Sequence, residues 1–181
     1  MTRRKWLLLV ACVSVVLLSG GIGLTRASFV DVETSTSNDI QAWTSAVWTQ
    51  TSQTDFEAGV SIEVDTATSP GDVMLGQQGG FYLDSGSLAS QVLDIGISGA
   101  RWDGLFWDGT FPAGTAVTFE ARAGDTAFTA NDTSPDWLAF GANSPVTVGL
   151  PDGRYMQWRA TLSTSDNSTT PILSEVGIYH Y

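Results

Sequence analysis

The stretch Arg154-Tyr-Met-Gln-Trp-Arg-Ala-Thr-Leu162 decides the fold, because apolar and polar side chains alternate along it. One face would carry Met156, Trp158, Ala160 and Leu162, and the opposite face Gln157, Arg159 and Thr161. Side chains of a β-strand point to alternate faces, so a repeat of two residues is the period of a strand. The stretch therefore predicts a strand with one buried and one solvated face.

The same alternation recurs along the chain between Gly, Pro, Asn and Asp residues. In 115–123, Val117, Phe119 and Ala121 would face inward, with Thr118, Glu120 and Arg122 outward. In 171–181, one side would carry Ile172, Val176 and Ile178. Further strands are expected at 81–84, 88–95, 101–107, 137–140 and 146–148. About eight short strands predict an all-β protein, a two-sheet, jelly-roll-like β-sandwich.

The N-terminus reads as an export signal over residues 1–27. Arg3, Arg4 and Lys5 precede an uncharged apolar run over 6–24, and small residues lead to a cleavage site between Ala27 and Ser28. A retained anchor is the alternative, because a run of this length spans roughly 30 Å of hydrocarbon. We expect a secreted or cell-surface protein that meets the membrane through this segment.

Cleavage changes the charge strongly, since it would leave four Arg, no Lys and nineteen acids, a formal charge of 4 − 19 = −15. Such a surface repels nucleic acids and anionic lipids, which excludes both as partners. Cys12 lies in the signal, so the exported chain would have no thiol or disulfide. The remaining 181 − 27 = 154 residues are enough for one domain with its own core.

Residues 28–58 are richer in Ser, Thr and Gln than the rest. We therefore divide the exported chain into an N-terminal extension over 28–58 and a sandwich domain over 59–181. At the start of the extension, Val30 and Val32 alternate with acidic residues, as in an extended strand.

The segment Ala27-Ser-Phe-Val-Asp-Val-Glu-Thr-Ser-Thr-Ser-Asn38 resembles the export junction of the TasA and camelysin family of surface proteins. The resemblance implies self-association into extracellular fibres or a biofilm matrix, in which an N-terminal strand completes the sheet of the next subunit. Phe29, Val30 and Val32 are the candidate exchange residues. Pairing of this strand within its own domain, or a role as a spacer, is the alternative.

A second resemblance covers most of the body, and several separate segments carry it. They are Thr54-Asp-Phe-Glu-Ala-Gly59, Asp65-Thr66, Ser69-Pro-Gly-Asp-Val73, Ser85-Gly-Ser-Leu-Ala-Ser90, Gly153-Arg-Tyr-Met-Gln-Trp-Arg-Ala160 and Thr170-Pro171. This pattern is similar to a β-sandwich module of large secreted proteins, with the layout of galactose-binding-like jelly rolls.

The sequence favours a non-enzymatic role without a cofactor. His180 is the only histidine and lies next to the C-terminus, so a Ser-His-Asp triad or a multi-His zinc site is not expected. A carboxylate pair for glycoside hydrolysis stays open as an alternative. Its candidates are Asp103, Asp108, Glu120, Asp136 and Glu175.

A glycan is a candidate ligand, because aromatic faces stack on sugars while polar neighbours orient the hydroxyl groups. Trp102, Phe106 and Trp137 are the candidate binding residues, and packing of these rings in the core is the alternative. In the run 101–109, Leu105 and Trp107 would face the core, leaving Trp102 or Phe106 exposed.

Calcium is a candidate partner at loops over 103–108 or 131–132, since hard cations bind several oxygen ligands. Asn131 and Asn167 begin Asn-x-Thr triplets, the acceptor pattern for N-glycosylation.

Overall fold

The computed structural model describes residues 46–147 and 149–181, within the structural unit Ala42–Tyr181. The predicted signal over 1–27, its cleavage between Ala27 and Ser28, and the exchange residues Phe29, Val30 and Val32 lie outside the described residues. In the described part of the chain, no helix is long and apolar enough to cross a membrane.

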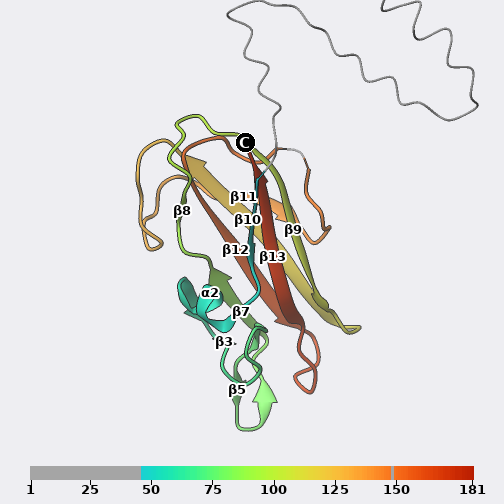
Figure 1. The fold of residues 1–181 in the computed structure, drawn as a ribbon. Coiled ribbons are helices and arrows are strands. Elements are labelled where there is room, and N and C mark those ends of the chain that lie inside the picture. Colours follow the sequence, from blue (N-terminus) through green and yellow to red (C-terminus); the bar gives the residue numbers. More distant parts are fainter. Residues whose placement is uncertain (1–45, 148) are drawn as a thin grey trace, which may run out of the picture. The chain divides into compact units, whose positions relative to one another are not determined.

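The predicted all-β class is confirmed. In chain order the described elements are β1 (Ala46–Gln50), α2 (Gln53–Glu57), β2 (Val60–Ile62), β3 (Val64–Asp65), β4 (Met74–Leu75), β5 (Gln77–Gln78), β6 (Phe81–Tyr82), β7 (Ser85–Ala89), β8 (Leu93–Asp94), β9 (Trp102–Thr110), β10 (Thr115–Gly124), β11 (Leu138–Gly141), β12 (Tyr155–Thr164) and β13 (Ile172–His180). Figure 1 shows α2, β3 and β5 at the end of the body away from the C-terminus.

Two antiparallel sheets form the sandwich. The larger sheet has the strand order β11-β10-β12-β7-β2, with β8 also paired to β12, and the smaller sheet has the order β1-β13-β9. Their inner faces share one core, in which Trp107 of β9 stacks on Phe119 of β10 with ring centroids 4.0 Å apart. Trp158 of β12 packs beside Phe119 at 5.7 Å. Burial of these large rings supplies much of the hydrophobic stabilisation.

The alternation of β10 and β12 is confirmed on the inner face and differs on the outer face. Every residue expected inside is buried: Val117, Phe119, Ala121, Met156, Trp158, Ala160 and Leu162. Arg122 and Gln157 were expected in solvent, yet neither side chain is exposed at all. The reason is tertiary, because backbone carbonyls from residues 129–135 lie over Arg122 and accept its hydrogen bonds.

Two irregularities of strand pairing reverse the expected orientation of two further side chains, those of Trp102 and Ile172. Asp103 is an extra residue in β9 where β9 pairs with the end of β13, so Trp102 turns to the core side and is only 2% exposed. Ser174 is an extra residue in β13, so Leu173 faces the core and Ile172 does not share the side of Val176. A bulge shifts the alternation by one residue, which a strict two-residue pattern does not register.

The chain joins the sandwich earlier than the predicted boundary between residues 58 and 59. β1 pairs along its whole length with β13, from Ala46 opposite His180 to Gln50 opposite Val176. The α2 helix is capped by Ser52, whose Oγ accepts the Asp55 N–H at 3.2 Å, and it buries Phe56. Residues 46–58 therefore belong to the sandwich rather than to a separate extension.

Candidate functional site

A groove crosses the outer face of the larger sheet. Its main part encloses about 390 Å³ between β2, β7, β12 and the segment 130–137. A second hollow of about 300 Å³ continues from it and shares Ile62, Ser87 and Arg159 with it. We call the two together the sheet groove. Its lining combines hydroxyl groups, apolar side chains and the indole of Trp137.

Arg122 holds one wall of the groove in place. Its Nε and Nη2 donate to Oε1 of Gln157 at 2.9 and 2.7 Å, and Nη2 also donates to the carbonyls of Thr129 and Ala130 at 3.2 and 3.3 Å. Nη1 donates to the carbonyl of Asp132. Burial lowers the pKa of Arg122, but guanidinium stays protonated in proteins. A buried cation held by carbonyl groups thus fixes the backbone of 129–132.

Trp137 is packed between the sheet and that wall. The guanidinium carbons of Arg122 and Arg159 each lie 4.5 Å from the centroid of its ring. Arg159 in turn donates through Nε to Oε2 of Glu120 at 2.7 Å. The two cations and the ion pair leave Trp137 half-buried in a defined position.

The structure does not bring the three predicted aromatic residues together. Trp102 is buried and donates from Nε1 to the carbonyl of Gly153 at 2.8 Å, so it offers no face to a ligand. Phe106 lies on the outer face of the smaller sheet, over Gly177, with its ring 5.3 Å from that of Tyr179. Of the three, Trp137 alone lines the sheet groove.

Sequence reasoning missed the residues that position Trp137. Arg122, Gln157, Glu120 and Arg159 were assigned to a plain solvated face. One sequence signal was available: a long polar segment, 125–137, directly follows β10. In the structure this segment covers the outer face of that strand. Neither sheet alternation nor composition says over which face such a segment folds.

Both candidate glycosylation residues are exposed. Asn131 lines the sheet groove, and Asn167 lies in the turn between β12 and β13. The Asn167 carbonyl accepts the Tyr82 N–H at 2.9 Å, which ties that turn to β6. Glycosylation at either residue stays a prediction.

The acids do not form a recognisable metal centre. Within residues 46–147 and 149–181, no group of three or more His, Cys, Asp or Glu is arranged to hold a metal ion. Asp103 and Asp108 lie within β9 rather than in the expected loop. Calcium binding at 103–108 and at 131–132 stays a prediction.

Among the acids considered for glycoside hydrolysis, Asp108 and Glu175 become direct neighbours, as paired residues of β9 and β13. Glu120 is instead paired with Arg159, and Asp103 accepts the Tyr181 hydroxyl at 3.1 Å. His180 lies against the Trp102 ring at 5.3 Å, and burial lowers its pKa.

Among the strands that the structure describes, β1 is an edge strand with little protection against further pairing. Its sequence Ala-Val-Trp-Thr-Gln has no charge and no proline, and its pairing with β13 has no bulge. Trp48 is only partly buried against the core, and Val47 is 50% exposed. The other edges are shorter or irregular: β2 has three residues, the β10–β11 pairing shifts register, and β9 is bridged by Val146.

The chain matches no family model, and no curated protein is similar to it. The fold and the sites above therefore carry the functional argument.

Proposed function

We propose that this protein is a secreted, non-enzymatic cell-surface subunit, structural or adhesive, of an extracellular filament or matrix built by strand addition. The observation that supports the proposal most is the unprotected edge of β1. Exposed edges present unpaired N–H and C=O groups, and natural proteins usually block them with charges, prolines or bulges. β1 has none of these.

The chain carries a suitable donor next to this edge. Phe29–Glu33 is a five-residue stretch with Val30 and Val32 on one side, and β1 also has five residues. An added strand with this pattern would cover Trp48 with valine side chains, which increases buried apolar area. The linker 34–45 is longer than the usual hairpin loop of about two to five residues, which is enough chain for the donor to reach the edge of a second copy.

Assembly of the mature chain tests this proposal. We expect the purified protein to form oligomers or fibres, measured by sedimentation velocity and electron microscopy. Val47→Lys should abolish them by placing a charge at the acceptor edge, and a Val30→Asp, Val32→Asp variant should do the same through the donor.

Ile62→Lys is the matched control, because Ile62 is an exposed residue of a different edge strand, 58% exposed against 50% for Val47. A protein that stays monomeric at high concentration contradicts the proposal. Equal loss of assembly in the Ile62 and Val47 variants would show that β1 is not the acceptor.

A second candidate function is that of a monomeric carbohydrate-binding surface module. The groove with Trp137 fixed by two guanidinium groups favours it, because sugar sites combine an aromatic side chain with polar groups of defined position. A calorimetric screen of glycans, with and without calcium, tests this function. Complete absence of binding rules it out.

A further inference from the structure

The floor of the sheet groove is rich in hydroxyl groups. Ser85, Ser87 and Thr161 line its second hollow, and none of these side chains is fully buried. Ile62 borders both hollows and is 58% exposed, the largest exposed fraction among the large apolar side chains of the described residues. Hydroxyl groups beside apolar surface match the mixed polar and apolar faces of a sugar chain.

The charges around the groove disfavour an anionic ligand. Arg159 is the one cation among its described lining residues, and Glu120 already neutralises it. Glu63 and Asp132 also line the groove. A hydrogen bond from the Thr129 N–H lowers the pKa of Asp132 and keeps it ionised. The local balance is negative, so a uronate or sulfate chain would be repelled.

The wall of the groove contains a buried cation, whose desolvation lowers stability and is not needed for packing of the core. Arg122 is fully buried, and the carbonyl groups and the Gln157 amide oxygen around it are neutral acceptors. Burial of a charge carries a desolvation penalty even when the charge is hydrogen-bonded, and buried ion pairs can often be replaced by apolar residues of similar volume without loss of stability. What this arrangement achieves is a segment 129–137 that is hydrogen-bonded to Arg122 at several carbonyl groups and presents Trp137 and Asn131 to the groove.

We propose that the sheet groove binds an extended, neutral polysaccharide chain that runs across β2, β7 and β12 toward Trp137. The inference rests on the second candidate function, carbohydrate binding, and assigns its site and ligand class. From β2 to β10 the outer face measures roughly 14 Å, three strand spacings of about 4.8 Å, which accommodates a short stretch of polymer. Neutral contacts of this kind bind independently of ionic strength.

Affinity gel electrophoresis of the full mature chain tests the inference. The probes are three neutral polysaccharides (mannan, laminarin and soluble starch) and one anionic polymer, polygalacturonate, each at low and high NaCl. We expect at least one neutral polymer to retard the protein to the same extent at both salt concentrations, and polygalacturonate to leave its mobility unchanged.

Two variants place the site. Ser87→Tyr fills the floor of the groove from an outward-facing position, and we expect at least tenfold weaker binding. Thr49→Tyr, an exposed outward residue of the smaller sheet, is the control and should bind as the parent does. Trp137→Ala should also weaken binding at least tenfold. Thermal unfolding of each variant verifies that the fold is retained.

Each outcome separates the inference from the function on which it rests. Binding of polygalacturonate in place of the neutral polymers overturns the ligand class and leaves carbohydrate binding standing. Neutral binding that Ser87→Tyr leaves unchanged in a folded variant overturns the site. Absence of binding to all four polymers overturns the inference, and the calorimetric screen of glycans then decides separately whether the second candidate function stands.

Discussion

At the scale of single residues, Gln50 shows how closely β1 is joined to the core. Its side chain is fully buried, accepts the Trp158 Nε1–H at 2.8 Å and donates to the Asp55 carbonyl at 2.8 Å. Gln50→Ala would leave a buried indole N–H without its partner and open a cavity. We expect the free energy of unfolding to fall by about 2–4 kcal/mol, measured by urea denaturation.

Gln78→Ala is the control for this prediction, because Gln78 is exposed in β5. It should change the unfolding free energy by less than about 0.5 kcal/mol. If the two variants are equally stable, β1 is not an integral part of the sandwich in solution.

His180 gives the fold a defined pH response. Burial lowers its pKa below the ordinary value of 6.5, so the unfolded chain takes up a proton at a higher pH than the folded one. Stability is therefore greatest above about pH 6.5 and falls as the pH drops through the folded-state pKa. Urea unfolding between about pH 5 and 7.5 should show this slope.

His180→Gln should remove the slope over the same range of pH. NMR titration of the ring, which gives a single signal because the sequence has one histidine, should report the lowered pKa directly. An unshifted or raised pKa contradicts the prediction.

At the scale of elements, the close approach of β2 to β7 depends on Gly59. A Cβ at this residue would lie 2.0 Å from the carbonyl oxygen of Ala89, which is backbone and cannot move without disturbing the pair. Gly59→Ala should lower the unfolding free energy by about 1–3 kcal/mol. Gly124→Ala is the control, since the nearest atom to a Cβ there is a Pro135 side-chain carbon at 3.8 Å. Equal stability of the two variants, measured by urea denaturation, refutes the argument.

The β9–β13 pair places two negative charges next to each other. Asp108 and Glu175 are directly opposite each other, and like charges in such a pair are destabilising. Asp108→Asn removes the repulsion, while the amide oxygen can still accept the Gly109 N–H that Asp108 Oδ1 accepts at 2.8 Å. We expect a gain of about 0.2–1 kcal/mol in chemical denaturation. Asp136→Asn, in the exposed segment before β11, should give no comparable gain.

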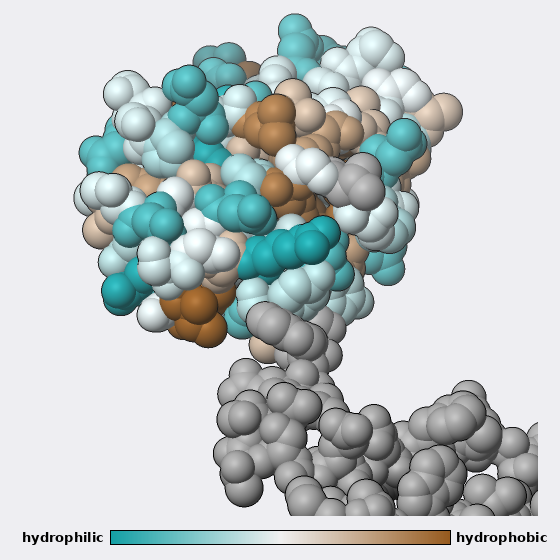
Figure 2. Space-filling model, turned by 90° about the horizontal axis from the view of Figure 1, so that it is seen from above, coloured by the Kyte–Doolittle hydropathy of each residue, from teal (hydrophilic) through white to brown (hydrophobic). Residues whose placement is uncertain are grey.

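At the scale of the whole molecule, acidic residues dominate the electrostatics. The sequence has nineteen acids against eight basic residues, while two ion pairs, Arg154–Asp94 and Arg159–Glu120, form in the described part of the chain. Repulsion between acidic side chains therefore exceeds the attraction within ion pairs. Figure 2 shows hydrophilic residues interspersed with small hydrophobic areas on the end viewed from above.

Added salt screens this repulsion and should stabilise the fold. Between about 0.05 and 1 M NaCl the Debye length shrinks to about 3 Å. We expect Tm, measured by differential scanning calorimetry, to rise with added salt. The rise should be roughly 2–4 °C for each 1 kcal/mol gained in the free energy of unfolding. A fall in Tm with salt would show that attractive pairs outweigh the repulsion.

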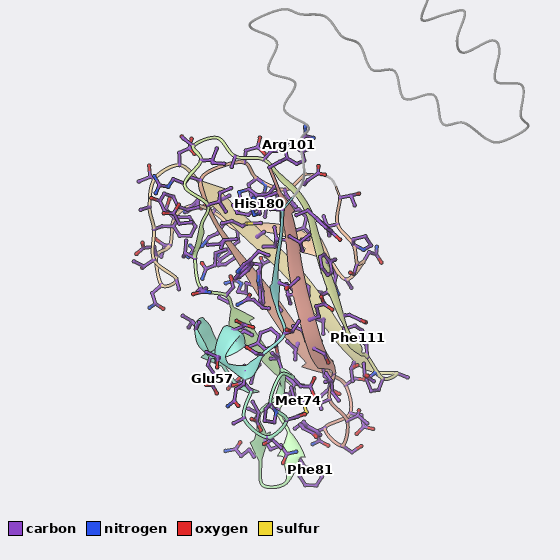
Figure 3. All side chains as sticks on the ribbon, in the orientation of Figure 1. Glu57, Met74, Phe81, Arg101, Phe111 and His180 are labelled. Carbon is purple, nitrogen blue, oxygen red and sulfur yellow. The ribbon has the colours of Figure 1, made fainter. Side chains whose placement is uncertain are left out.

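The strands at one end of the sandwich were predicted from the sequence better than the short elements at the other end. Figure 3 shows Arg101 and His180 near the C-terminal end, and Glu57, Met74 and Phe81 near the opposite one. Met74 and Phe81 fall in short strands and turns over 63–84, where the strand expected at 81–84 corresponds to β6 and the other two-residue strands are too brief for a periodic signal. The predicted strand over 88–95 is likewise divided, into β7 and β8.

The sequence by itself determined the all-β class and the inner faces of β10 and β12, because alternation is a local property of a strand and large apolar residues must be buried. Only the tertiary structure decided the burial of Arg122 and Gln157, the inward turn of Trp102, the place of β1 beside β13 and the position of Trp137 in the groove. Each depends on segments distant in sequence that meet in space, through a bulge, an overlying loop or an edge, and a local pattern contains no information about such meetings.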